Sequence, residues 1–174
     1  MKLLPRNNKF FLVGVIFCVF AFAVTVFIAI FPNKVFLFIE SPQEGGDFAS
    51  NAFRIEKASQ IKEIRGNYSR WNFNHPGPGF FYAYALGEKA FLDFAKIANS
   101  EHAAHVFSGI LLQSGFFVAA LYLVYLTTGK LGTMITAFFI GIIHFALTEM
   151  AFTSIWPPHQ ILMTFLCWAM SCIA

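Results

Sequence analysis

The chain has 174 residues, of which 57% are hydrophobic and only 12% are charged. Soluble domains carry about 25% charged residues, so this composition argues against a water-soluble globular protein and favours a membrane protein. The net charge of +3 is too small and too scattered to indicate a nucleic-acid-binding protein. The three cysteines all lie in apolar stretches, where they are typical of small buried hydrophobic residues.

The first predicted element is an apolar run over residues 10–31, which contains no charge and follows three basic residues. A secretion signal has an apolar core of about 7–15 residues and then a small-residue cleavage site. A bilayer span needs about 20 apolar residues. The 22 residues of this run, followed by Pro32-Asn33-Lys34, therefore predict an uncleaved membrane-spanning helix.

Three further apolar segments predict spans at about 102–126, 131–150 and 160–174. The fold class expected is all-α, with polytopic transmembrane helices and a long outer loop that carries amphipathic interfacial helices. The last segment has about 15 residues, which is short of a span. We therefore expect residues 1–174 to be the N-terminal part of a longer transmembrane domain.

The basic residues indicate the orientation of these spans. The N-terminal tail is basic, and the tight turn 127–130 between the second and third spans has one lysine and no acid. The positive-inside rule places both in the cytoplasm. The loop 32–101 and the short loop 151–159 are then expected outside, in an inner or plasma membrane of the cell envelope.

Two helices are predicted within the long loop. Apolar residues at helical spacing follow Asp47 and predict a helix over about 48–58. Residues 80–98 alternate aromatic with charged residues, which is typical of an amphipathic helix lying in the membrane interface. A turn-rich stretch from Gly66 to Gly79 separates the two.

Asp47 is the first candidate for chemistry. A carboxylate just outside the first span could act as a general base, or hold a divalent cation beside a phosphate. The alternative is an ordinary helix cap, which typically contributes about 1 kcal/mol. Local sequence favours the cap, although the two preceding glycines would let backbone approach a ligand closely.

A second candidate is the run 68–78, which two prolines hold in a restricted conformation. An arginine fork suits phosphate oxygens, and aromatic faces suit sugars or isoprenoids. An ordinary interfacial turn with belt aromatics explains the same residues. The candidate binding residues in this run are Tyr68, Arg70, Trp71, Asn74 and His75.

Polar residues near the later spans complete the candidates. Glu149 lies near the outer end of an apolar segment, and an ionisable residue there is a functional candidate. Trp156 and His159 lie on the same expected face, where an interfacial tryptophan and a proline-led helix start are the plainer explanation. His102 and His105 lack a third ligand at a recognisable spacing, so interface histidines are favoured over a metal site.

In its order of elements the chain resembles the GT-C glycosyltransferases, polytopic enzymes that include protein O-mannosyltransferases and lipid A aminoarabinose transferases. The shared order is a basic tail, one span, a loop that opens with an acid, shallow helices and a His-Pro motif before aromatics. In this sequence these last features are Asp47 and the run Asn74-His75-Pro76-Gly77-Pro78-Gly79-Phe80-Phe81-Tyr82. The resemblance covers roughly residues 10–170.

The resemblance implies transfer of a sugar from a polyprenyl-phosphate donor to an acceptor at the outer membrane face. Asp47 matches the first-loop acid, which serves as base or cation contact, and His75 matches the segment that supports the donor site. Many members place a second acid at the start of the fourth span, where this chain has Trp156-Pro157-Pro158-His159-Gln160. The role of this second acid therefore falls to His159, to Glu149 or to no residue of this chain.

Two other classes of protein remain open from the sequence. A transporter or flippase component for lipid-linked precursors would need polar residues near the middle of its spans. A small four-span accessory protein would need a complete fourth span and would not depend on Asp47. No nucleotide-binding loop or hydrolase motif is present in the sequence.

Overall fold

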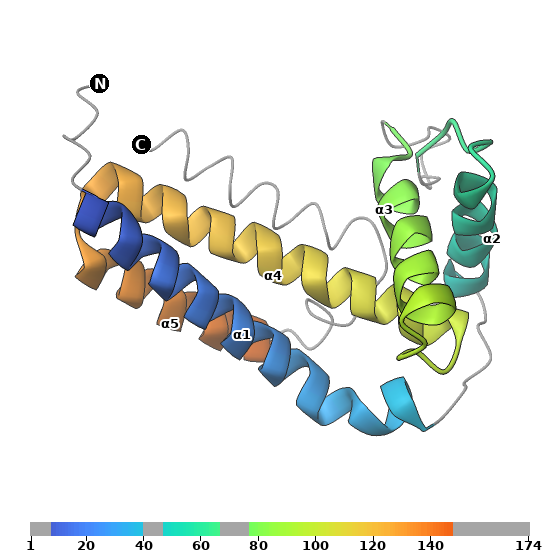
Figure 1. Cartoon of the computed structure of the whole chain (residues 1–174), viewed down its shortest axis with the longest axis horizontal. Coiled ribbons are helices and arrows are strands. Elements are labelled where there is room, and N and C mark those ends of the chain that lie inside the picture. The colour runs from blue at the N-terminus through green and yellow to red at the C-terminus, as the bar shows by residue number, and fades with distance from the viewer. Residues whose placement is uncertain (1–7, 40–46, 67–76, 148–174) are drawn as a thin grey trace.

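The computed structural model describes residues 8–39, 47–66 and 77–147. Within these ranges every regular element is helical: α1 (Asn8–Phe38), α2 (Asp47–Ser59), α3 (Gly79–Glu88), the π-helix η1 (Lys89–Phe94), α4 (Glu101–Thr128) and α5 (Leu131–Leu147). The expected all-α class is confirmed. The helices α1, α4 and α5 lie side by side along the long axis of the molecule (Figure 1).

The long helices α1 and α4 run antiparallel and pack closely along their length (Figure 1). Phe10 stacks on Tyr125 with ring centroids 4.3 Å apart, and the Tyr125 hydroxyl donates to the Phe10 carbonyl at 3.1 Å. At Gly14, an added Cβ would lie 2.6 Å from the Tyr125 ring. A glycine at this position therefore lets the two helices approach, as small residues do in membrane helix pairs.

Helix α5 follows α4 through a tight turn, as the sequence predicts. Gly129 ends α4 in the left-handed conformation with φ of 67°, and α5 begins at Leu131. Phe117 of α4 stacks on Phe138 of α5 at 6.2 Å, and an added Cβ at Gly141 would lie 2.3 Å from the Phe117 ring. A glycine notch thus receives the aromatic ring between these helices.

Two helical stretches in the described residues, 8–35 and 101–128, are long and apolar enough to cross a membrane, while the apolar stretch 131–143 is shorter. Large apolar side chains of α1 point outward along its length. These side chains, all more than half exposed, are Phe11, Leu12, Ile16, Val19, Phe20, Phe27 and Phe31. A stripe of this size is suited to lipid rather than water.

Helix α1 does not end at residue 31, where we expected the outer loop to start, but continues through Pro32 to Phe38. A proline inside a helix removes one hydrogen bond and crowds the carbonyl one turn earlier, which costs about 3 kcal/mol. Burial of Leu37 and the contact of Phe38 with Phe107 of α4 offset this cost. The Asn33 side chain also donates to the Ala29 carbonyl at 2.8 Å. The helix bends in its C-terminal part (Figure 1), as proline-containing helices do.

The helices α2, α3 and η1 form a separate group, here called the α2–α3 unit (residues 47–66 and 77–98). It lies at the end of the molecule where α4 begins, and α3 runs across the axis of α4, between α4 and α2 (Figure 1). Ile55 of α2 and both Phe81 and Tyr84 of α3 are buried in this unit. The helix predicted after Asp47 is confirmed, with Asp47 as its first residue.

The second predicted loop helix, over 80–98, is shorter than expected and changes type. An α-helix over 79–88 gives way to the wider turn of η1, in which the Ala95 amide donates to the Ala90 carbonyl at 2.9 Å. Lys96 then adopts a positive φ of 53°, and the Ile97 and Ala98 amides turn back to the Phe91 carbonyl. Single π turns of this kind occur often at functional sites.

Candidate functional site

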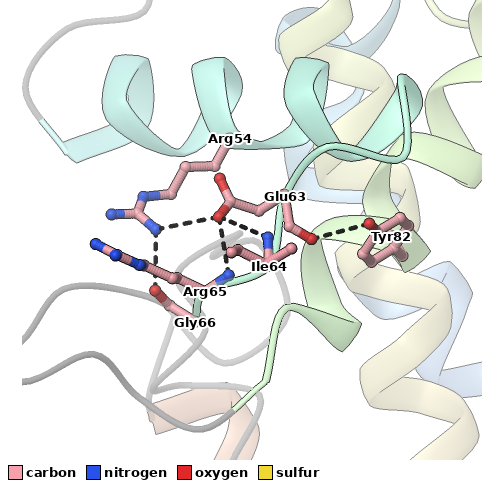
Figure 2. A network of polar contacts seen from close by, with 6 residues as sticks. All are labelled: Arg54, Glu63, Ile64, Arg65, Gly66 and Tyr82. Carbon is pink, nitrogen blue, oxygen red and sulfur yellow. Dashed lines mark hydrogen bonds and ion pairs between the residues drawn. The ribbon is translucent and has the colours of Figure 1, made fainter.

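A polar network joins α2 to the start of α3 (Figure 2). The Arg54 guanidinium donates to the Gly66 carbonyl at 2.9 Å and lies 3.9 Å from the Glu63 carboxylate. The Tyr82 hydroxyl of α3 donates to the Glu63 carbonyl at 2.9 Å. Three separate pieces of chain, namely α2, the segment after it and α3, are therefore connected through Arg54, Glu63 and Tyr82.

The Glu63 side chain is buried, yet its charge is well compensated. The same carboxylate oxygen accepts from the Ile64 amide at 3.1 Å and from the Arg65 amide at 3.0 Å, in addition to the ion pair with Arg54. Backbone amides and a cation are the partners that a buried carboxylate requires. Arg54 also lies over the Phe81 ring at 5.8 Å. Its bonds within the network give Arg54 a structural role rather than that of a ligand-binding residue.

This network lies on both sides of the stretch that holds most of the candidate residues. Residues 67–76 lie outside the described part of the chain, between Gly66, which Arg54 holds, and Gly77, which leads into α3. Tyr82 connects the two flanks through its bond to Glu63. The chain before and after the predicted binding run is thus held within the α2–α3 unit.

The candidate residues fall as follows. Asp47 starts α2 and belongs to the α2–α3 unit. The other eight lie outside the described residues, so their grouping stays a prediction: Tyr68, Arg70, Trp71, Asn74, His75, Glu149, Trp156 and His159.

A second polar contact, between α3 and α4, was not predicted. His105 Nε2 lies 2.9 Å from the Glu88 carboxylate, and the His105 side chain is 1% exposed, against 23% for Glu88. The Tyr84 ring lies 6.3 Å from the imidazole. His105 therefore lies buried at the contact between α3 and α4, where its Nε2 atom has a partner. No local sequence signal could reveal its partner, because the two residues lie 17 positions apart on different helices.

Beside this pair, the junction of α3 and η1 with α4 contains an open groove of about 530 Å³. Its walls are almost wholly apolar, and small residues contribute much of the space. The lining residues are Ala83, Leu86, Gly87, Ala90, Phe91, Ser108, Leu111, Leu112, Gly115 and Phe116. The one hydroxyl among them, on Ser108, donates to the Ala104 carbonyl at 2.7 Å. The groove therefore presents no unsatisfied polar group to a ligand.

No group of three or more histidine, cysteine or acidic side chains in the described ranges is arranged to hold a metal ion. Comparison of the chain with models of protein families, with curated proteins and with solved structures finds no match.

Proposed function

We propose that this chain belongs to a polytopic membrane glycosyltransferase that moves a sugar from a polyprenyl-phosphate donor to an acceptor at the outer membrane face. The proposed topology is that of an inner or plasma membrane protein with its N-terminus in the cytoplasm and the segment between α1 and α4 outside. Two membrane-length apolar helices, with the α2–α3 unit at one end of them, support this arrangement (Figure 1). The GT-C resemblance supplies the reaction type.

The observation that carries the proposal is the network of Arg54, Glu63 and Tyr82 (Figure 2). It ties together the two flanks of residues 67–76, the run with the arginine, histidine and aromatic residues suited to a phosphate-linked sugar. Transfer needs such groups held in one geometry, because catalysis depends on positioning within fractions of an ångström. The buried Glu63 carboxylate, with three partners at its Oε1 atom, holds the chain on one side of this run in place.

In the proposed reaction the acceptor hydroxyl attacks the anomeric carbon of the donor sugar. The new bond joins the acceptor oxygen to that carbon, and the bond between the carbon and the phosphate oxygen breaks. The acceptor proton passes to the Asp47 carboxylate, and the leaving electron pair stays on the polyprenyl phosphate, whose charge Arg70 stabilises. In the alternative that the sequence leaves open, Asp47 positions a divalent cation on the donor phosphate instead of accepting the proton.

The test uses the full-length protein, purified and supplied with a radiolabelled polyprenyl-phosphate sugar and an acceptor. Asp47→Asn should lower transfer by about 10²–10⁴-fold, the usual contribution of a positioned base. Asp93→Asn, the same change at an exposed carboxylate in η1, should leave transfer unchanged. Equal activity in the Asp47→Asn variant and the unmodified protein would remove Asp47 from the mechanism.

One observation favours a second candidate, a transporter or flippase for lipid-linked precursors. Gln113 and Ser114 lie near the middle of α4 and are fully buried. The polar atoms of their side chains have no hydrogen-bond partner among the described residues. Buried polar groups at mid-span are typical of transport pathways. The test measures movement of a fluorescent polyprenyl phosphate between the two leaflets of proteoliposome membranes that contain the protein. Movement that Gln113→Leu abolishes, in a protein that transfers no sugar, would favour this candidate over the enzyme.

A further inference from the structure

The open groove between α3, η1 and α4 has no part in the reaction proposed above. On α4 it is lined by the buried Ser108 and by four half-buried residues after it, whereas the neighbouring Gln113, Ser114 and Phe117 are buried. Those lining residues form a different face from the one that meets α1 through Tyr125. The groove therefore opens outward, and Leu86 on its α3 side is 70% exposed.

We infer that this groove binds one acyl chain of a phospholipid from the leaflet next to the α2–α3 unit. The inference rests on the membrane placement in the proposed function, but not on the transfer reaction. A hydrocarbon chain suits the site because the lining is apolar and the Ser108 hydroxyl is already bonded within its own helix.

The position of the groove along α4 indicates the kind of chain. Helix α4 has 28 residues, so its length is about 42 Å, roughly 12 Å more than a hydrocarbon core of about 30 Å. Centred in the bilayer, it would enter that core about 6 Å from its first residue. The lining residues on α4 start at Ser108 and end at Phe116, roughly 10–22 Å from that residue. The groove thus covers about 4–16 Å of core depth, close to one leaflet of about 15 Å.

An acyl chain of one leaflet matches that depth, whereas a polyprenyl chain is several times longer and would leave most of its length outside. The charges nearby suit a phospholipid phosphate. Lys89, whose ammonium donates to the Ser59 carbonyl at 3.5 Å, is the first residue of η1, and the exposed Lys96 follows the end of that helix. Of the acids on this stretch, Glu88 is engaged with His105, and Asp93 is exposed.

A large side chain introduced at a glycine that lines the groove should fill the groove and exclude a ligand. An added Cβ at Gly115, which lines the groove, has no heavy atom within 4 Å. Gly115→Phe should therefore occupy the groove without displacing its walls. Gly132 in α5 is equally open but does not line the groove, so Gly132→Phe is a matched control.

The experiment uses the full-length protein in mild detergent with added palmitoyl-oleoyl phosphatidylglycerol, and counts bound phospholipids by native mass spectrometry. We expect Gly115→Phe to retain one phospholipid fewer than the unmodified protein and Gly132→Phe. Equal numbers in all three would overturn the inference. A loss of polyprenyl phosphate rather than phospholipid would also overturn it, in favour of a donor chain in the groove.

A second measurement keeps the test independent of folding in the variant. A phosphatidylglycerol with a photoreactive acyl chain should cross-link the unmodified protein at Leu86, Phe91 or Leu112. Cross-links confined to other faces of the protein would refute the site. A disulfide that formed readily between a cysteine at 115 and one within 160–174 would also refute it, because the chain itself would then fill the groove.

Alkaline carbonate extraction distinguishes failure of the lipid site from failure of the proposed function. Release of the protein from membranes by carbonate would refute the membrane placement. An unchanged number of bound phospholipids in Gly115→Phe would refute the lipid site alone.

Discussion

The contact between α3 and α4 at Gly87 offers the sharpest test of the arrangement in Figure 1. A Cβ added at Gly87 would lie 1.8 Å from Ser108 Oγ and 2.8 Å from Ser108 Cβ. Rotation of the serine side chain can relieve the first contact, at the expense of its bond to Ala104, but not the second. Gly87→Ala must therefore push α3 away from α4.

The magnitude follows from two opposing effects. Overpacking of this kind costs about 1–3 kcal/mol, while replacing glycine by alanine inside a helix stabilises it by about 1 kcal/mol. Because one contact would be as short as 1.8 Å, we expect the steric effect to dominate, with a net loss of about 1–2 kcal/mol in the free energy of unfolding. Gly115→Ala, which meets open space, should lose nothing and gain up to about 1 kcal/mol.

The assay is equilibrium unfolding of the full-length protein in mixed micelles, followed by circular dichroism, for both variants and the unmodified chain. Ser108→Gly removes both atoms that an alanine at position 87 would contact. In the Ser108→Gly background, Gly87→Ala should therefore lower the free energy of unfolding much less than it does in the unmodified chain. A Gly87→Ala protein as stable as the unmodified chain would refute the close packing of α3 on α4.

Three further outcomes follow from the contacts described. Tyr82→Phe removes the hydroxyl that connects α3 to the segment after α2, and should lower the unfolding free energy by about 0.5–1.5 kcal/mol in the same assay. Glu88→Ala removes a partner of the buried His105 and should cost about 1–3 kcal/mol. In a variant whose native cysteines are replaced by serine, Ile61→Cys should react with an impermeant maleimide on intact cells, whereas Lys130→Cys should react only after permeabilisation.

Matched variants distinguish these effects from general damage. Tyr122→Phe loses the same hydroxyl but keeps its ring against Phe11, and Glu56→Ala removes an exposed carboxylate from α2, so both should be near neutral. If Tyr82→Phe and Tyr122→Phe behaved alike, the hydrogen bond to the Glu63 carbonyl would have no measurable role. Equal labelling of both cysteine variants on intact cells would contradict the proposed topology.

Local sequence determined much of the helical framework. A long, mostly apolar run is sufficient to predict most of α1 and α4, because a bilayer-length helix needs only composition and length. Gly129 marked the turn between α4 and α5, since a helix end in the left-handed conformation favours glycine. The helical spacing after Asp47 predicted α2. The run around His75 and the reaction assigned to Asp47 stay predictions from sequence.

Tertiary contacts decided the rest. The continuation of α1 beyond Pro32 brings Phe38 to 5.5 Å from Phe107 of α4, and the π turn after Glu88 brings Phe91 to 5.9 Å from the same ring. Neither contact is visible in a single stretch of sequence. The bond between Glu88 and His105 and the groove beside Gly115 arise only where α3 crosses α4. Residues distant in the chain meet there because small side chains allow two helices to approach closely. Which residue lies opposite a given glycine depends on how the helices pack, and the sequence around that glycine does not reveal it.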